Sequence, residues 1–295
     1  MQLLEMIATI RSETLNQIFS LVTKAGEEII AILVLCAIFW CIDKKLAYCI
    51  GISYFLSGLL VQGLKITFRV DRPWVLNRNF EPVAGAKETA TGYSFPSGHT
   101  QSSSALFGTL GFKLKKGWQK FLCFLILVLV GFSRMYLGVH TLLDVAVSMG
   151  VTLLISFLMV QFYDKKGKSS LITVPLILTI IAVSIAVYAY SLFSSGVIDE
   201  SYVIDCLKAS GAGVGFAVGM YIEKKYIDFS VKCKNIWIQI VKYIVGIVGV
   251  LAVKEGLKLI IGIGPIVDTC RYVLIGLFIS AIYPYIIKKV FSTKD

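Results

Sequence analysis

Apolar stretches long enough to cross a lipid bilayer recur along this chain of 295 residues. A helix needs about 20 mostly apolar residues to cross a hydrocarbon core of about 30 Å. Charged residues make up only 16% of the chain, whereas soluble globular domains contain about 25%. The short alternating segments typical of membrane β-barrels are missing from the sequence. The sequence therefore predicts an all-α membrane protein.

The apolar stretches predict about nine transmembrane helices. Their expected bounds are Glu28–Asp43, Leu46–Thr67, Ser97–Phe112, Trp118–Met135, Thr141–Tyr163, Leu171–Phe193, Tyr202–Glu223, Ile236–Ile263 and Asp268–Lys289. Residues 1–25 differ, because charged residues such as Glu5 and Arg11 interrupt apolar ones at helical spacing. We expect an amphipathic helix along the membrane interface there, and not a signal peptide.

Lysine clusters between the apolar stretches predict the orientation of the chain. They lie at 44–45, 113–120, 165–168, 224–234 and 288–294, on one side of the membrane if the spans alternate. By the positive-inside rule that side is cytoplasmic, together with the C-terminus, and the segment Phe68–Pro96 lies on the opposite side. The formal charge of +11 then reflects membrane orientation, and no nucleic-acid partner is predicted because the lysines form no single patch.

Each of the two histidines lies in a short polar motif near a predicted helix end. His140 and Asp144 are four residues apart, so they share a face if the segment is helical. A carboxylate that accepts one ring N–H leaves the other ring nitrogen available as a nucleophile or base. The spacing therefore predicts an activated histidine.

The second histidine belongs to Pro96-Ser97-Gly98-His99, which is typical of a helix start. Ser97 is expected to cap the helix, and Gly98 would let a ligand approach the backbone. The free N–H groups of a helix start favour an anion such as phosphate. His99 would then be well placed as a general acid.

Three cations, Lys65, Arg72 and Arg134, come from separate segments on the predicted outer face. Any one of them alone would be typical of a side chain that snorkels to the interface. Together they run against the positive-inside bias and lie beside the histidines. Since arginine matches phosphate oxygens well, the set predicts a phosphoryl-transfer site. The seven cysteines show no metal-binding spacing.

Three motifs carry a resemblance to a known family: Lys65-x6-Arg72-Pro73, Pro96-Ser97-Gly98-His99 and Ser133-Arg134-x5-His140-x3-Asp144. They match the three-part signature of the type-2 phosphatidic acid phosphatase superfamily, and the resemblance covers roughly residues 28–163. It implies hydrolysis without metal or cofactor, in which His140 forms a phosphohistidine, Asp144 orients His140, and His99 protonates the leaving group. The residues implied in phosphate binding are Lys65, Arg72, Ser97, Gly98 and Arg134, with a hydroxyl contact from Ser133.

The resemblance also implies an organisation for the chain. We expect an interfacial helix at 1–25, a phosphatase core of the six-helix type at 26–164, and further transmembrane helices at 165–295 that complete the bundle. The small residues Gly211, Gly215 and Gly219 line one face of a predicted helix and permit close helix packing, within the monomer or across a homodimer.

The substrate stays open at this stage. A lipid phosphate in the membrane is expected, of the phosphatidic acid, phosphatidylglycerophosphate or undecaprenyl diphosphate type. A phosphatase for sphingosine phosphate or a sugar phosphate is the alternative within the superfamily. A transporter or binding protein that holds lipid phosphates without hydrolysis is the alternative of another class. The lysine- and isoleucine-rich composition indicates a bacterial plasma membrane, although an endoplasmic-reticulum enzyme would have a similar topology.

Overall fold

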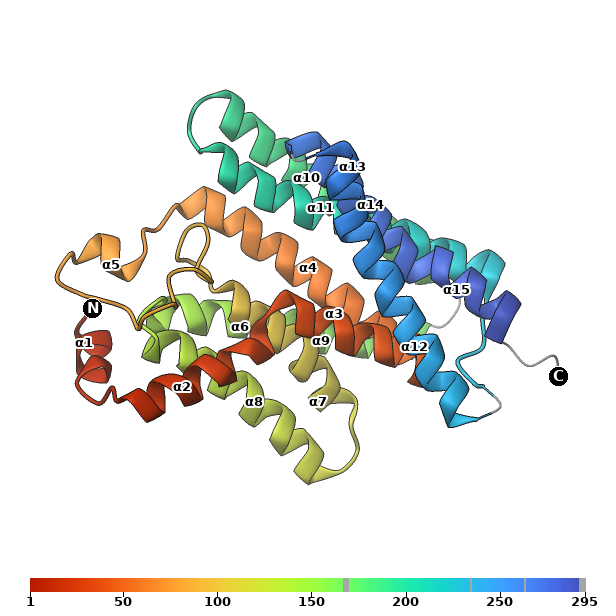
Figure 1. Cartoon of the computed structure of the whole chain (residues 1–295), viewed down its shortest axis with the longest axis horizontal. Helices are drawn as coiled ribbons and strands as arrows, with labels where there is room; N and C mark the ends of the chain where they lie inside the picture. Colours follow the sequence, from red (N-terminus) through yellow and green to blue (C-terminus); the bar gives the residue numbers. More distant parts are fainter. Residues whose placement is uncertain (167–169, 234, 263, 292–295) are drawn as a thin grey trace. The chain divides into compact units, whose positions relative to one another are not determined.

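The computed structural model describes residues 1–166, 170–233, 235–262 and 264–291 (Figure 1). Every regular element within these ranges is a helix, which confirms the predicted fold class. Four sequence-based predictions fall outside the described residues: the loop lysines Lys168, Lys234 and Lys294, and the end of a span at Ile263.

The α-helices follow one another in this order: α1 (Gln2–Ala8), α2 (Glu13–Val22), α3 (Glu28–Ala37), α4 (Lys44–Phe68), α5 (Pro73–Leu76), α6 (Gly98–Ser103), α7 (Thr109–Lys113), α8 (Gly117–Tyr136), α9 (Leu142–Lys166), α10 (Ser170–Ser194), α11 (Glu200–Ile222), α12 (Ile236–Leu251), α13 (Leu257–Ile261), α14 (Pro265–Leu277) and α15 (Tyr283–Ile286). Short π-helical turns continue several of them.

Within the described ranges, seven helices are long and apolar enough to cross a membrane. They are Lys44–Leu76, Gly117–Tyr136, Leu142–Tyr163, Ile172–Ser194, Glu200–Ile227, Ile236–Ile260 and Pro265–Phe291. The bent pair Glu13–Gly26 and Glu28–Ile42, with a 51° break, raises the number to eight if it is one span. The predicted count of nine is not confirmed, because the helical run that begins at Gly98 ends at Lys113, short of a full span.

The N-terminal segment forms two helices where one was predicted. Helix α1 ends at Ala8, and α2 begins at Glu13 after Ser12, whose hydroxyl accepts a hydrogen bond from the Leu15 amide at 3.3 Å. Such a serine cap favours a new helix start at this point. The single interfacial helix over residues 1–25 is therefore not confirmed.

The chain forms two compact units that do not follow its order. The first unit contains Met1–Ile32 and Leu60–Val160, and the second unit contains Leu33–Leu59 and Gln161–Asp295. All the residues of the three motifs lie in the first unit. The N-terminal helices α1 and α2 belong to the same unit as the motifs.

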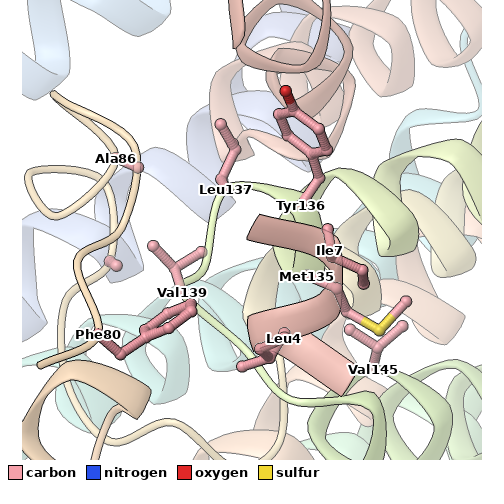
Figure 2. Close-up of a cluster of buried hydrophobic side chains, with 10 residues drawn as sticks. Leu4, Ile7, Phe80, Ala86, Met135, Tyr136, Leu137, Val139 and Val145 are labelled. Carbon is pink, nitrogen blue, oxygen red and sulfur yellow. The ribbon is translucent and has the colours of Figure 1, made fainter. Parts of the chain in front are cut away.

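A buried apolar cluster holds the N-terminus to the motif segment of the first unit (Figure 2). Leu4 and Ile7 are three residues apart and share the buried face of α1. They pack with Phe80 and with the chain around His140, including Leu137 and Val139. The cluster therefore joins α1 to the segment that carries the predicted nucleophile.

In the second unit, α11 packs closely against α14 through its small residues. A Cβ atom on Gly211 would lie 2.5 Å from the Thr269 carbonyl oxygen, and one on Gly215 would overlap the Val273 carbonyl oxygen. The third small residue, Gly219, meets the Ser280 side chain in the same way. These glycines therefore mediate helix packing within the chain. This is one of the two roles predicted for them, the other being contact across a homodimer.

The glycines of α11 offer a matched test of this packing. We expect Gly215→Ala to lower the unfolding free energy by about 1–3 kcal/mol, because the added methyl meets a backbone carbonyl that cannot rotate away. Gly213→Ala adds the same methyl on the same helix, but its nearest neighbour, a Leu59 methyl, is 3.5 Å away. Thermal unfolding in detergent micelles measures both variants. Equal melting temperatures would contradict the close approach of α11 and α14.

Candidate active site

His140 and Asp144 lie together at the start of α9, and both are almost fully buried. His140 Nδ1 is 3.4 Å from Asp144 Oδ2. The same carboxylate oxygen accepts hydrogen bonds from the Ser94 hydroxyl at 2.6 Å and from the Thr141 amide at 2.7 Å. His140 precedes the helix, which begins at Leu142, so the predicted pair is adjacent although its histidine is not helical.

The surroundings of His140 assign the positions of its ring proton and lone pair. Arg72 Nη1 lies 3.0 Å from His140 Nε2. A guanidinium group only donates hydrogen bonds, so Nε2 accepts and the ring proton is on Nδ1, toward Asp144. His140 Nδ1 lies near Asp144 but forms no hydrogen bond within the described residues, so activation of His140 by Asp144 stays a prediction.

The Pro96–His99 segment begins the α6 helix as predicted and is bound to α9. Ser97 Oγ caps the helix by accepting from the Thr100 amide at 3.4 Å. The Ser97 amide donates to the Asp144 carbonyl at 3.1 Å, and Ser148 Oγ donates to the Ser97 carbonyl at 2.6 Å. A Cβ atom on Gly98 would meet no atom within 4 Å. The backbone at Gly98 therefore has open space beside it.

Arg134 is completely buried at the end of α8. Its Nη1 donates to Thr23 Oγ1 at 2.8 Å. Its Nε and Nη2 are buried and have no hydrogen-bond partner among the described residues. A buried cation with two such N–H groups on one edge suits a ligand that accepts two hydrogen bonds, as a phosphate does.

Lys65 and Arg72 hold the loop that leads to Pro96. Lys65 Nζ donates to the Tyr93 carbonyl at 2.8 Å. Arg72 donates from Nε to the Gly92 carbonyl at 3.0 Å and from Nη2 to the Thr91 carbonyl at 2.5 Å. Both side chains are buried. The two cations therefore stabilise the loop through hydrogen bonds to its backbone oxygens.

The three cations act on both histidines. Burial is the largest effect on the pKa of His99, and the charges of Arg134, Lys65 and Arg72 add to it, so that this pKa falls to about 3. Burial also lowers the pKa of His140, with Arg72 as the strongest charged contributor. Both imidazoles are therefore neutral at neutral pH in the protein without a bound anion.

Ser133 is placed differently from the other motif residues. Its side chain is buried, and its hydroxyl donates to the Val130 carbonyl one helical turn earlier, at 2.7 Å. The predicted contact with phosphate stays a prediction, because it requires this hydroxyl to rotate away from α8.

Two polar partners of the site lie outside the three motifs and were not predicted. Ser94 donates to Asp144, and Thr23 accepts from Arg134. Ser94 lies two residues before the second motif, so the sequence could have indicated that it belongs to the site. Thr23 is 111 residues from Arg134, and nothing in the local sequence indicates this contact.

The donor set of the site favours an anion. Among the residues that the structure describes, His, Cys, Asp and Glu side chains form no group of three or more that could hold a metal ion. The motif residues instead combine three cations with one carboxylate and two neutral histidines. Such a buried positive site can bind a phosphoryl group and stabilise the charge of its transition state.

Comparison with known proteins agrees with this class of site. The model of the PAP2 superfamily matches residues 45–168, and that of a PAP2 superfamily phosphatase transmembrane extension matches residues 207–294. An undecaprenyl-diphosphatase of Sulfolobus acidocaldarius is 33% identical over 150 residues, which are 50% of this chain and 70% of that protein. The chain belongs to the PAP2 superfamily, the type-2 phosphatidic acid phosphatases that its motifs resemble.

Two relatives from Bacillus subtilis are also similar. Phosphatidylglycerophosphatase B of strain 168 is 32% identical over 122 residues, which are 37% of this chain and 58% of the relative's length. The crystal structure of a transmembrane PAP2-type phosphatidylglycerolphosphate phosphatase has 25% sequence identity and a TM-score of 0.47, over 55% of this chain and 83% of that chain.

The lowered pKa of His99 predicts proton uptake when an oxyanion binds. An anion near Arg134 offsets the positive charge that lowers this pKa, so the pKa rises on binding and the protein takes up a proton. Titration calorimetry with tungstate, in buffers of different ionisation enthalpy at neutral pH, measures the uptake. We expect His99→Gln to lose it. Proton release by the unaltered protein, or unchanged uptake in His99→Gln, would contradict the assignment.

Proposed function

We propose that this chain is an integral-membrane phosphatase that hydrolyses a phosphate monoester or diphosphate of a lipid. One observation carries the proposal: His140 is buried, with Nδ1 3.4 Å from Asp144 Oδ2 and Nε2 3.0 Å from Arg72 Nη1. A binding site alone needs cations, whereas an oriented imidazole lone pair suits a nucleophile. This favours an enzyme over a lipid-phosphate transporter or binding protein.

In the proposed reaction, the substrate phosphate takes over the hydrogen bonds of Arg72 and exposes His140 Nε2. This nitrogen attacks phosphorus, so that a P–N bond forms as the P–O bond to the lipid breaks. Asp144 stabilises the positive charge that develops on the imidazole. His99, protonated in the complex, gives its proton to the leaving oxygen, and then accepts a proton from the water that hydrolyses the phosphohistidine.

The phosphoryl oxygens are bound by the groups that surround both histidines. Arg134 offers the Nε and Nη2 edge that has no partner within the described residues. Lys65 and Arg72 add positive charge, and the open space at Gly98 lets an oxygen reach the backbone next to Ser97. Ser133 would add a hydroxyl after rotation. Since these cations supply the charge stabilisation, we propose that the reaction needs no metal or cofactor.

The names of the relatives support a lipid substrate. They include a phosphatidylglycerophosphatase and an undecaprenyl-diphosphatase. We therefore propose phosphatidic acid, phosphatidylglycerophosphate or undecaprenyl diphosphate as the substrate type. Sphingosine phosphate and sugar phosphates are the second choice, since the site recognises a phosphoryl group that all of these compounds carry.

The proposed location is a bacterial plasma membrane, with the active site on the extracytoplasmic face and the C-terminus in the cytoplasm. The lysine clusters between the apolar stretches support this orientation. In the proposed division of the chain, residues 26–164 form the phosphatase core, 1–25 lie at the membrane interface, and 165–295 complete the bundle. Association into a homodimer through the transmembrane helices also stays a prediction.

Release of inorganic phosphate by the purified protein tests the proposal. In detergent with EDTA, we expect hydrolysis of at least one member of a panel that contains the three preferred lipids, sphingosine phosphate and glucose 6-phosphate. His140→Ala should lower the rate by about 10⁴-fold or more, because it removes the nucleophile. Hydrolysis that EDTA abolishes would contradict metal independence. Binding of a lipid phosphate with no hydrolysis of any compound would favour the transporter or binding protein.

A further inference from the structure

Residues 1–32 precede the part of the chain that the superfamily model matches, yet they belong to the same compact unit as the motifs. They contact all three of the parts that meet around His140: the end of α8, the start of α6, and the turn between α8 and α9. The contacts are polar as well as apolar. Residues 1–32 are therefore part of the structure that surrounds the site.

Thr23 makes a polar contact with α8. Its side chain is only 6% exposed, and its hydroxyl oxygen accepts from Nη1 of the fully buried Arg134 at 2.8 Å. Thr23 lies in the short 3-10 helix Thr23–Gly26, which connects α2 to α3. The Thr23 hydroxyl therefore binds Nη1 of Arg134. The Nε and Nη2 groups of Arg134 have no hydrogen-bond partner in the described part of the chain.

The backbone next to Thr23 lies directly on the second motif. A Cβ atom on Gly26 would lie 2.7 Å from the His99 carbonyl oxygen and would overlap Val130 of α8. The close approach of the Gly26 backbone thus sets the distance between the 3-10 helix and the start of α6. Because this short helix packs against both α6 and α8, the Thr23 hydroxyl has a defined position beside Arg134.

Arg11 makes the third contact, with the turn that leads to His140. Its Nε donates to the Tyr136 carbonyl at 3.1 Å and its Nη1 to the Glu81 carbonyl at 2.7 Å. Gly138 in this turn has a φ of +79°, and a Cβ atom there would lie 2.6 Å from Arg11 Nη2. Together with the apolar cluster of Leu4 and Ile7 (Figure 2), this contact holds the N-terminal segment against the turn.

We propose that Thr23 is a positioning residue of the phosphate site. By accepting a hydrogen bond from Nη1, its hydroxyl turns the Nε and Nη2 edge of Arg134 toward the phosphoryl group. The inference rests on the proposed role of Arg134 in binding phosphate. Its physical basis is preorganisation: an arginine that is already oriented loses less conformational freedom when the anion binds.

A role in packing alone would have a different consequence. Valine has nearly the same shape as threonine but cannot accept a hydrogen bond, whereas serine keeps the hydroxyl and loses the methyl group. If Thr23 only fills space, Thr23→Val would behave as the unaltered protein. If its hydroxyl orients Arg134, Thr23→Ser would retain function and Thr23→Val would lose it.

The test measures tungstate binding by calorimetry and hydrolysis of the best panel substrate by the full-length protein in detergent. We expect Thr23→Val to weaken tungstate binding about tenfold and to raise KM by a similar factor, since a hydrogen bond to a charged group is lost. Thr23→Ser should stay within about twofold of the unaltered protein on the same reasoning. Thr9→Val is the matched control, because Thr9 is exposed and its hydroxyl donates to the Met6 carbonyl of its own turn.

Two results would overturn the inference. One is tungstate affinity in Thr23→Val equal to that of the unaltered protein. The other is an equal loss in Thr23→Ser and Thr23→Val, which would indicate packing. Failure of the proposed function is a separate result, because weakened tungstate binding in Thr23→Val would support the positioning role even if the unaltered protein hydrolysed no ester.

Discussion

Positive charge buried in an apolar unit is the constraint on which the site depends. Lys65, Arg72 and Arg134 are each less than a tenth exposed, and transfer of an ion from water to such surroundings costs several kcal/mol unless partners compensate it. Hydrogen bonds to backbone carbonyls of the Thr91–Tyr93 loop and to the Thr23 hydroxyl orient these cations. Neutral dipoles orient a cation without cancelling its charge. Such an arrangement suits the anion site that we propose.

Burial is the main reason that both imidazoles are neutral before an anion binds, and the three cations add to its effect. The proposed nucleophile His140 needs this neutral state. A phosphate that offsets the cations would raise the pKa of His99 and favour its protonation. Asp144 is a single carboxylate beside three cations, and the Ser94 hydroxyl and the Thr141 amide hold it in place. The same set of charges thus supports both proposed roles, His140 as the nucleophile and His99 as the general acid.

Sequence patterns predict the parts of the site that depend on local spacing. Short motifs predict the helix start at Gly98 and the neighbouring positions of His140 and Asp144, which are adjacent although His140 precedes the helix. They also predict that the three cations lie near the histidines, on whose pKa values their charges act. The contacts of Thr23 and Arg11 could not be predicted in this way. A single hydrogen bond between segments more than 100 residues apart leaves no repeating pattern in the sequence. The break between α1 and α2 was not predicted, although Ser12, whose hydroxyl caps α2, is a local signal for it.

The identity of the phosphorylated residue tests the central claim most directly. His99→Ala lacks the group proposed to protonate the leaving oxygen and to activate the hydrolytic water. With an aryl phosphate, whose leaving group needs no proton, only the second step is slowed, so a phosphoenzyme should accumulate. Rapid quenching at alkaline pH, followed by proteolysis and mass spectrometry, locates the phosphate. The account predicts an acid-labile phosphate on His140. Phosphate on another side chain, or turnover by His99→Ala without any covalent intermediate, would contradict it.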